Sequence, residues 1–221
     1  VENCANLAFS FLTGAMDEGF YRNKLTGYTK TAFDSLQAKY AGRLMNHSAD
    51  SLFRHRIELI PNCGHSIDYS LTTPWLKTYK RNPYPHTFMW EDYPMDGQRR
   101  QGFYNLYVMK RPKAADGLKD ASGEDRDYYE MDIQNNVIRL SVKKVTYQTV
   151  ERDPVYGIDL KFTKSYHPVS GGKWKIYLND QLVDMNKPVT VFINDRKAFE
   201  GKIVPRMEDM ITSCMEYFDP C

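Results

Sequence analysis

The first 98 residues alternate strand-like and helix-like patterns. Residues 5–13, "ANLAFSFLT", form a short, mostly apolar run of the kind expected for a strand buried on both faces. Apolar positions in residues 29–42, "TKTAFDSLQAKYAG", recur at helical spacing and end at a glycine. Residues 56–60, "RIELI", predict a second strand, and residues 72–82, "TTPWLKTYKRN", begin with a cap-and-proline signal for a second helix. This alternation predicts a parallel sheet.

From residue 99 the pattern changes to about seven short runs rich in β-branched and aromatic residues, separated by turn clusters such as "SGGK" and "LND". This pattern predicts an all-β, sandwich-like domain over residues 99–221, closed by a helix within "PRMEDMITSCMEYF" at residues 205–218. Asn194 and Asp195 tolerate positive φ, so "VTVFIN" and "KAFEGKIV" are predicted to form a hairpin. The predicted fold class is therefore α/β over residues 1–98 and all-β over the rest.

The α/β region is small for a parallel sheet. Two strands and two helices cannot cover both faces of such a sheet, and parallel strands are nearly always covered on both. Residues 1–98 are therefore expected to be part of a larger domain. The aromatic residues Tyr84, Phe88 and Trp90 in the following segment are expected to join the two regions; a carbohydrate platform is the alternative.

Composition narrows the class of protein. Hydrophobic residues make up 42% of the chain and charged residues 26%, which is typical of a globular protein. The net charge is +2, with both signs interspersed, so no nucleic-acid partner is expected. No apolar run reaches the roughly 20 residues of a membrane span. The start, "VENCANLAFSFL", lacks the marks of a signal peptide, so a periplasmic or secreted location would require such a signal upstream.

The cysteines do not indicate in which cellular compartment the protein resides. The four cysteines are scattered along the chain, at positions 4, 63, 214 and 221, with no zinc-knuckle spacing. Free thiols are expected, and a pair between Cys214 and Cys221 is the alternative.

Two residues carry the chemical argument. Asp17 follows the first predicted strand and His65 follows the second, 48 positions later. Because parallel neighbours end at the same edge of a sheet, both side chains are expected to lie there. A carboxylate that accepts from one imidazole nitrogen leaves the other nitrogen able to act as a general base. We therefore expect a carboxylate oxygen of Asp17 about 2.6–3.2 Å from an imidazole nitrogen of His65.

Other interpretations of the same residues remain open. Glu18 is adjacent to the aspartate and competes for its role. The aspartate has Arg22 within reach as an ion-pair partner, and Asp68 is a local partner for the histidine. Cys63 and His65 are two metal-ligating residue types close together, but no second pair accompanies them, so no metal site is expected.

These segments resemble a known family. "FSFLTGAMDEGFYRN" looks like the acid-bearing loop of α/β-hydrolases, and "IELIPNCGHSIDY" resembles their histidine loop. Together with the β-rich tail containing "LVDMNKPVTVFINDRKAFEGKIV", the chain is similar to bacterial serine hydrolases of the esterase/peptidase type with an appended β-domain. The resemblance implies a partial α/β-hydrolase C-terminal segment at residues 1–98, Asp17 as the triad acid, His65 as the triad base, an ester or peptide substrate, and no cofactor or metal.

One required motif of that family does not occur in the chain. The nucleophile elbow, G-x-S-x-G, is absent; "PVSGG" and "DASGE" lie in turns of the β-rich region. The nucleophile and the oxyanion-hole segment are therefore expected in an N-terminal remainder of the hydrolase domain, and this chain alone is expected to be inactive. The alternatives are a non-catalytic binding or structural module, whose β-domain holds a partner or a glycan, and a hydrolase relative that has lost its chemistry.

Overall fold

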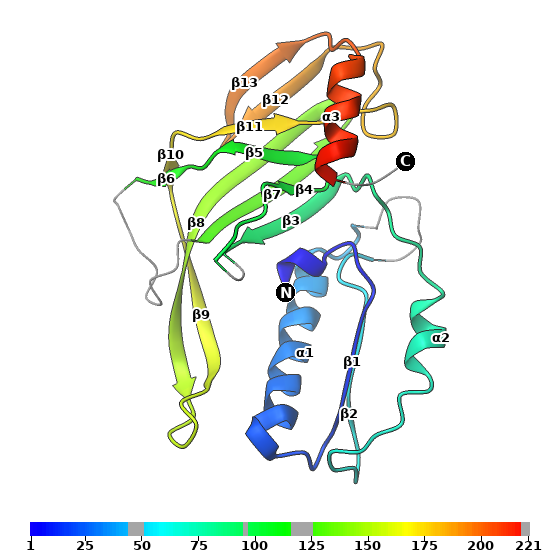
Figure 1. Ribbon diagram of the computed structural model, residues 1–221, viewed down its shortest axis with the longest axis vertical. Helices are drawn as coiled ribbons and strands as arrows, with labels where there is room; N and C mark the ends of the chain where they lie inside the picture. Colours follow the sequence, from blue (N-terminus) through cyan, green and yellow to red (C-terminus); the bar gives the residue numbers. More distant parts are fainter. Residues whose placement is uncertain (44–50, 95–96, 116–125, 218–221) are drawn as a thin grey trace. The chain divides into compact units, whose positions relative to one another are not determined.

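The computed structural model describes residues 1–43, 51–94, 97–115 and 126–217 (Figure 1). The chain divides into two compact units. Unit 1 comprises Val1–Asn82 and Tyr147–Lys164, and unit 2 comprises Pro83–Thr146 and Ser165–Cys221. Two long strands of one hairpin, β8 (Val137–Arg152) and β9 (Asp159–His167), each contribute residues to both units.

Unit 1 contains the parallel pair that the sequence predicts. Its elements in chain order are η1 (Glu2–Cys4), β1 (Phe9–Gly14), η2 (Gly19–Tyr21), α1 (Arg22–Lys39), β2 (His55–Ile60) and α2 (Thr72–Leu76). Strands β1 and β2 pair in parallel, from Phe9 opposite His55 to Gly14 opposite Ile60. Helix α1 begins at Arg22, seven residues before the predicted one. In its second turn, Oγ1 of Thr26 lies 2.8 Å from Oγ1 of Thr13 in β1 and shares a hydrogen bond with it.

A small aromatic cluster holds α1 against the two strands. Phe33 in α1 is 1% exposed, and its ring stacks on that of Phe9 with the centroids 4.8 Å apart. Phe53 meets the same ring edge-on at 6.5 Å, and His55 lies against it at 5.1 Å. Stacked and edge-on ring pairs of this kind stabilise a fold further, in addition to the stabilisation that comes from burying the rings.

The outer part of the β8–β9 hairpin packs against α1 and η1 through polar contacts. The hydroxyl of Tyr28 donates to Glu151 at 2.7 Å, and Lys24 pairs with the same carboxylate. Nζ of Lys164 bonds both carboxylate oxygens of Glu2, at 2.7 and 2.8 Å. These contacts join residues more than 120 positions apart, so they arise only from the tertiary fold.

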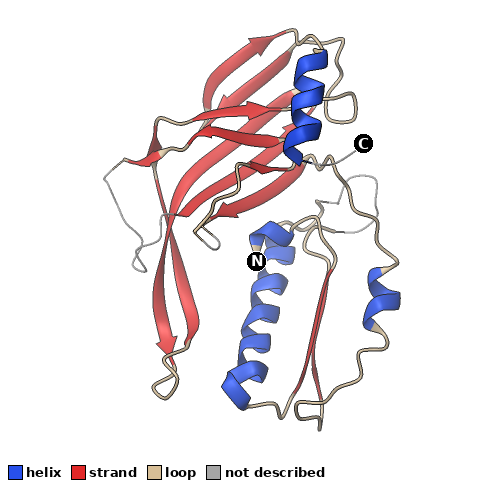
Figure 2. Ribbon diagram, in the orientation of Figure 1, coloured by secondary structure: helices blue, strands red, loops and turns tan. Residues whose placement is uncertain are grey.

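Unit 2 is built from antiparallel and mixed sheets (Figure 2). The largest sheet has the order β13-β12-β8-β7-β3, with β9 also pairing with β8. A second sheet has the order β11-β5-β4, and β10 pairs with β6. The bounds of these strands are β3 (Thr87–Asp92), β4 (Gly102–Phe103), β5 (Leu106–Lys110), β6 (Lys113–Ala114), β7 (Arg126–Gln134), β10 (Val169–Ser170), β11 (Lys173–Ile176), β12 (Val189–Ile193) and β13 (Arg196–Gly201).

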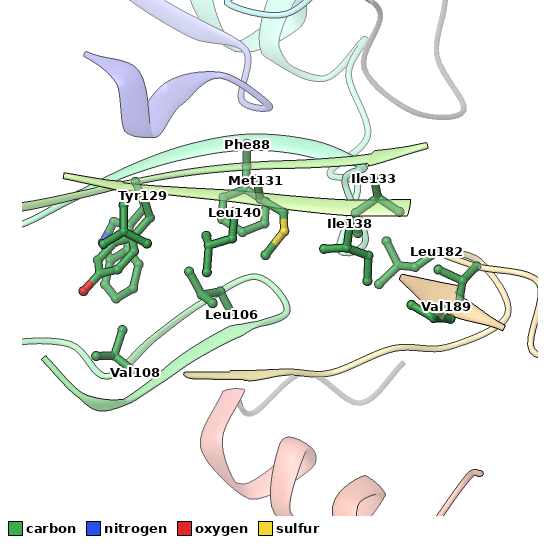
Figure 3. Close-up of a cluster of buried hydrophobic side chains, with 13 residues drawn as sticks. Phe88, Leu106, Val108, Tyr129, Met131, Ile133, Ile138, Leu140, Leu182 and Val189 are labelled. Atoms are coloured by element: carbon green, nitrogen blue, oxygen red, sulfur yellow. The ribbon is translucent and has the colours of Figure 1, made fainter. Parts of the chain in front are cut away.

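The apolar core of unit 2 lies between its two larger sheets (Figure 3). Side chains from β3, β7, β8 and β12 meet those of β5, and the members include Phe88, Leu106, Met131, Ile138 and Leu140, each at most 1% exposed. Strands β7 and β8 alternate buried and exposed positions, so one face of the large sheet supplies this core.

The predicted aromatic segment belongs to this core. Phe88 and Trp90 are 0% and 3% exposed, and Tyr84 packs against the same cluster. These rings therefore do not form the carbohydrate platform considered above.

Two elements of unit 2 lie where the sequence predicts them. Strands β12 and β13 form the predicted antiparallel hairpin, with Asn194 and Asp195 both at positive φ, 46° and 62°. This prediction is confirmed. Helix α3 (Met207–Tyr217) lies in the stretch predicted to be helical, and its apolar residues Met207, Met210 and Met215 are more than half exposed.

The predicted fold class is wrong. The protein is mostly β, with 41% strand and 19% helix, several sheets and three α-helices among the described residues, which fits a β-rich protein and not an α/β-hydrolase segment. The parallel pattern stops after β2. The next apolar run, "TFMWED", lies in the segment expected to join the two regions, but it forms β3 and pairs antiparallel with β7. Because the rest of the chain is mostly strand, the protein as a whole is β-rich.

The compact units also divide the chain differently from the predicted boundary between residues 98 and 99. Strand β3 joins unit 2 because it completes the large sheet. The hairpin segment Tyr147–Lys164 joins unit 1 because its contacts are with η1, η2 and α1.

Candidate functional site

The ends of β1 and β2 are held together by backbone hydrogen bonds. Beyond β1, the amide of Ala15 donates to the carbonyl of Ile60, and the amide of Met16 donates to that of Cys63, both at 2.9 Å. The loop after each strand therefore starts from a fixed position relative to the other loop. This is the edge where the sequence predicts the acid and the histidine.

Gly14 permits the close approach of these two loops. A Cβ at this position would lie 1.9 Å from the carbonyl oxygen of Gly64 and 2.3 Å from that of Cys63. Both neighbours are backbone atoms, which cannot rotate away as a side chain can. Only glycine at the end of β1 is compatible with the observed position of the histidine loop.

The acid loop is compact and internally bonded. The amide of Asp17 donates to the carbonyl of Gly14 at 3.0 Å, and Nδ2 of Asn23 donates to the carbonyl of Ala15 at 3.0 Å. Phe20 and Tyr21 both have positive φ, 51° and 58°, a conformation that costs non-glycine residues energy. Such consecutive positions persist where surrounding contacts hold them, and they turn the chain into α1.

Asp17 lies at the centre of a three-residue network. Nδ1 of His65 donates to its Oδ2 at 2.9 Å. Arg22, the first residue of α1, donates from Nε to Oδ2 and from Nη2 to Oδ1, both at 2.9 Å. The distance between the aspartate and the histidine falls within the expected range. The ion pair with Arg22, which the sequence offers as an alternative, is present together with the histidine contact.

The electrostatics keep this carboxylate ionised. The hydrogen bonds from Arg22, and after them the bond from His65, lower the pKa of Asp17 to about 2. An ionised carboxylate only accepts hydrogen bonds, so the bond from His65 requires the proton on Nδ1. Nε2 is then the basic nitrogen, and it has no hydrogen-bond partner among the described residues.

The two side chains of the pair differ in exposure to solvent. The side chain of Asp17 is 7% exposed and that of His65 is 77% exposed. An arrangement of this kind can take a proton from a group that approaches Nε2 from outside, while the aspartate stabilises the imidazolium.

The residues considered as alternatives to Asp17 and as partners of His65 are not hydrogen-bonded to the imidazole in the described part of the chain. Asp68 accepts from the amide and the hydroxyl of Ser70, at 2.8 and 2.9 Å, so it does not hold the imidazole. Glu18 is exposed, and Cys63 is a free thiol. No group of three or more histidine, cysteine, aspartate or glutamate side chains within the described residues could hold a metal ion.

The hairpin tip is a neighbour of the acid loop that the sequence analysis missed. The hydroxyl of Tyr21 donates to Oδ1 of Asp153 at 2.7 Å, and the ring of Phe20 lies 5.0 Å from that of Tyr156. Asp153 is 1% exposed and also accepts from the amide of Tyr156. No local signal marks this contact, because the partners are 132 positions apart.

Comparison with known proteins adds no relative. No family model, no curated protein and no solved structure matches the chain. The resemblance to bacterial serine hydrolases therefore rests on sequence segments alone. Among the described helices, none has the length and apolar character needed to cross a bilayer.

Proposed function

We propose that this chain belongs to a serine hydrolase acting on ester or amide bonds, in which Asp17 is the triad acid and His65 the triad base. The observation that carries the proposal is the 2.9 Å hydrogen bond from Nδ1 of His65 to a buried, ionised carboxylate, with Nε2 left without a partner among the described residues. The same order of acid and histidine on consecutive strands supports it.

In the proposed mechanism a serine hydroxyl attacks the carbonyl carbon of the substrate while Nε2 of His65 takes its proton. The imidazolium then gives that proton to the leaving oxygen or nitrogen, and a water repeats the sequence on the acyl-enzyme. Asp17 keeps the proton on Nδ1 and stabilises the imidazolium. Arg22 fixes both oxygens of the carboxylate, so the aspartate cannot rotate away from the ring.

The nucleophile is proposed to come from a further part of the catalytic domain. The chain has no G-x-S-x-G motif. Among the described residues, β1 and β2 pair only with each other, so each strand has one edge without a neighbour. Parallel strands normally lie within larger sheets, which supports a partner segment beside this pair.

The decisive experiment compares this chain alone with the protein encoded by its complete reading frame. We expect no fluorophosphonate labelling of the 221-residue chain, and labelling of one serine in the complete protein. In the complete protein, Asp17→Asn is expected to lower kcat by about 10⁴-fold, by analogy with the triad acid. The matched control is Asp68→Asn, which changes an acid in the same loop as the histidine without touching its ring.

Two outcomes would refute the proposal. One is labelling of the isolated chain at a serine that depends on His65, since the nucleophile would then lie within these residues. The other is an Asp17→Asn enzyme as active as the Asp68→Asn enzyme.

A further inference from the structure

The tip of the β8–β9 hairpin contacts the acid loop at two adjacent residues. The hydroxyl of Tyr21 donates to Oδ1 of Asp153 at 2.7 Å, and the ring of Phe20 lies 5.0 Å from that of Tyr156. All four residues belong to unit 1. The proposed mechanism gives these contacts no role, although Arg22, which binds both oxygens of the proposed triad acid, directly follows the two loop residues in the chain.

The two loop residues have an unfavourable backbone conformation. Phe20 and Tyr21, the left-handed pair, have φ of 51° and 58°, which costs free energy for residues other than glycine. They lie at the junction of η2 and α1, which adjoin in sequence. If both relaxed to the right-handed conformation, η2 would continue into α1, and Arg22 would move away from Asp17. The ion pair between Arg22 and Asp17 therefore depends on contacts that hold the left-handed pair.

The hairpin tip is a tight turn organised around Asp153. The amide of this residue donates to the carbonyl of Ile158 at 2.8 Å, its carbonyl accepts from the amide of Gly157 at 3.1 Å, and its carboxylate accepts from the amide of Tyr156. Asp153 is 1% exposed. Because a buried carboxylate needs hydrogen-bond donors, the Tyr21 hydroxyl is held in one place by the tip.

The same hairpin makes a second set of contacts with α1, away from the left-handed pair. The hydroxyl of Tyr28 donates to Glu151 at 2.7 Å, and Lys24 pairs with that carboxylate. These bonds fasten the hairpin to the helix beyond its first residue. Contacts that only stabilise unit 1 can therefore be separated by substitution from contacts that position the acid loop.

We propose that Asp153 and Tyr156 are positioning residues for the proposed triad. Through the left-handed pair they direct Arg22 onto Asp17, and the fixed carboxylate then keeps the proton of His65 on Nδ1. The proposal rests on the hydrolase function, because it concerns the same triad. It also gives the β-rich region beyond residue 99 a part in the chemistry.

The test measures which ring nitrogen of neutral His65 carries the proton, from ¹⁵N chemical shifts of the imidazole in the 221-residue protein at alkaline pH. In the wild type, Nδ1 is expected to carry it, because the carboxylate beside Nδ1 only accepts hydrogen bonds. Tyr21→Phe and Tyr156→Leu are each expected to raise the fraction protonated on Nε2 several-fold, because Asp17 is no longer fixed beside Nδ1.

Two matched controls accompany these variants. Tyr28→Phe removes a hydroxyl that bonds the same hairpin elsewhere, and Tyr156→Phe keeps the ring that lies against Phe20. Both should keep the wild-type tautomer. In the complete protein, Tyr21→Phe should lower kcat by about tenfold at an unchanged KM, because a displaced catalytic group slows the chemical step without weakening substrate binding.

The wild-type tautomer in folded Tyr21→Phe and Tyr156→Leu proteins would overturn the proposal. An equal change of tautomer in Tyr28→Phe and Tyr21→Phe would also overturn it, because it would show a general loosening of unit 1. If Tyr21→Phe fails to fold, the comparison of Tyr156→Leu with Tyr156→Phe gives the decision. Failure of the hydrolase function is distinct, because it would appear as a complete protein without fluorophosphonate labelling, whatever the tautomer of His65.

Discussion

Units 1 and 2 are stabilised by different kinds of contacts. Unit 2 has a continuous apolar core of 13 buried residues between two sheets. Unit 1 has two parallel strands, the outer part of the β8–β9 hairpin, one aromatic cluster around Phe33, and a set of polar and close backbone contacts where its loops meet. The candidate catalytic residues therefore lie where the chain depends on loop geometry, and the large apolar core lies in the other unit.

The largest expected effects come from truncating the buried cluster of each unit. Phe33→Ala should destabilise unit 1 by about 3–5 kcal/mol, and Leu140→Ala should destabilise unit 2 by about 2–5 kcal/mol, because each leaves a cavity. Hydrogen exchange measured by mass spectrometry should show lost protection in the unit that carries the substitution.

The control for these variants is Leu59→Ala in β2, whose side chain is 40% exposed. It should cost less than about 1 kcal/mol. Equal loss of protection in both units from either core variant would show that the units unfold as one, and the comparison would fail.

A second test addresses the close approach at the site. Gly14→Ala should destabilise the protein by about 1–3 kcal/mol, because the added methyl group meets the backbone of the histidine loop. Gly64→Ala, in that same loop, meets nothing within 4 Å and is the matched control. Urea denaturation gives the stability, and the NMR chemical shifts of the His65 ring report its displacement. Equal stability of the two variants would contradict the role given to Gly14.

A third test removes the contact between the acid loop and the hairpin tip. Tyr21→Phe deletes the hydroxyl that donates to the buried Asp153 and should cost about 1–3 kcal/mol, since the carboxylate loses a partner. Tyr28→Phe removes a similar bond to the less buried Glu151 and should cost less. Equal protease resistance of residues 150–158 in the two variants would argue against an anchoring role of Tyr21.

The smallest effect expected is a pH dependence confined to unit 1. The pKa of Asp17 is about 2 in the folded protein, below its ordinary value of 3.8. Because this pKa is lowered, the stabilisation from Asp17 is complete above about pH 4 and is lost as the pH falls towards 2. The difference in free energy of unfolding between wild type and Asp17→Asn should narrow over that range. A difference that stays constant would mean that the ionised carboxylate does not stabilise the fold.

Local patterns were sufficient for several features of this protein. Apolar runs of strand length located β1 and β2, and the pair Asn194–Asp195 located the turn of the β12–β13 hairpin. The shared edge of parallel strands also placed Asp17 and His65 within hydrogen-bond distance. These features follow from neighbouring residues and from the geometry of one strand pair, which the sequence alone determines.

Only the tertiary structure decided the rest. The fold class changed because "TFMWED" pairs with β7, and an apolar run does not specify its partner strand. The hydrogen bond between Tyr21 and the buried Asp153 depends on which distant segments come together. Burial and hydrogen bonding between distant segments are properties of long-range contacts, so composition and periodicity could predict local elements but not the contacts that distant residues make.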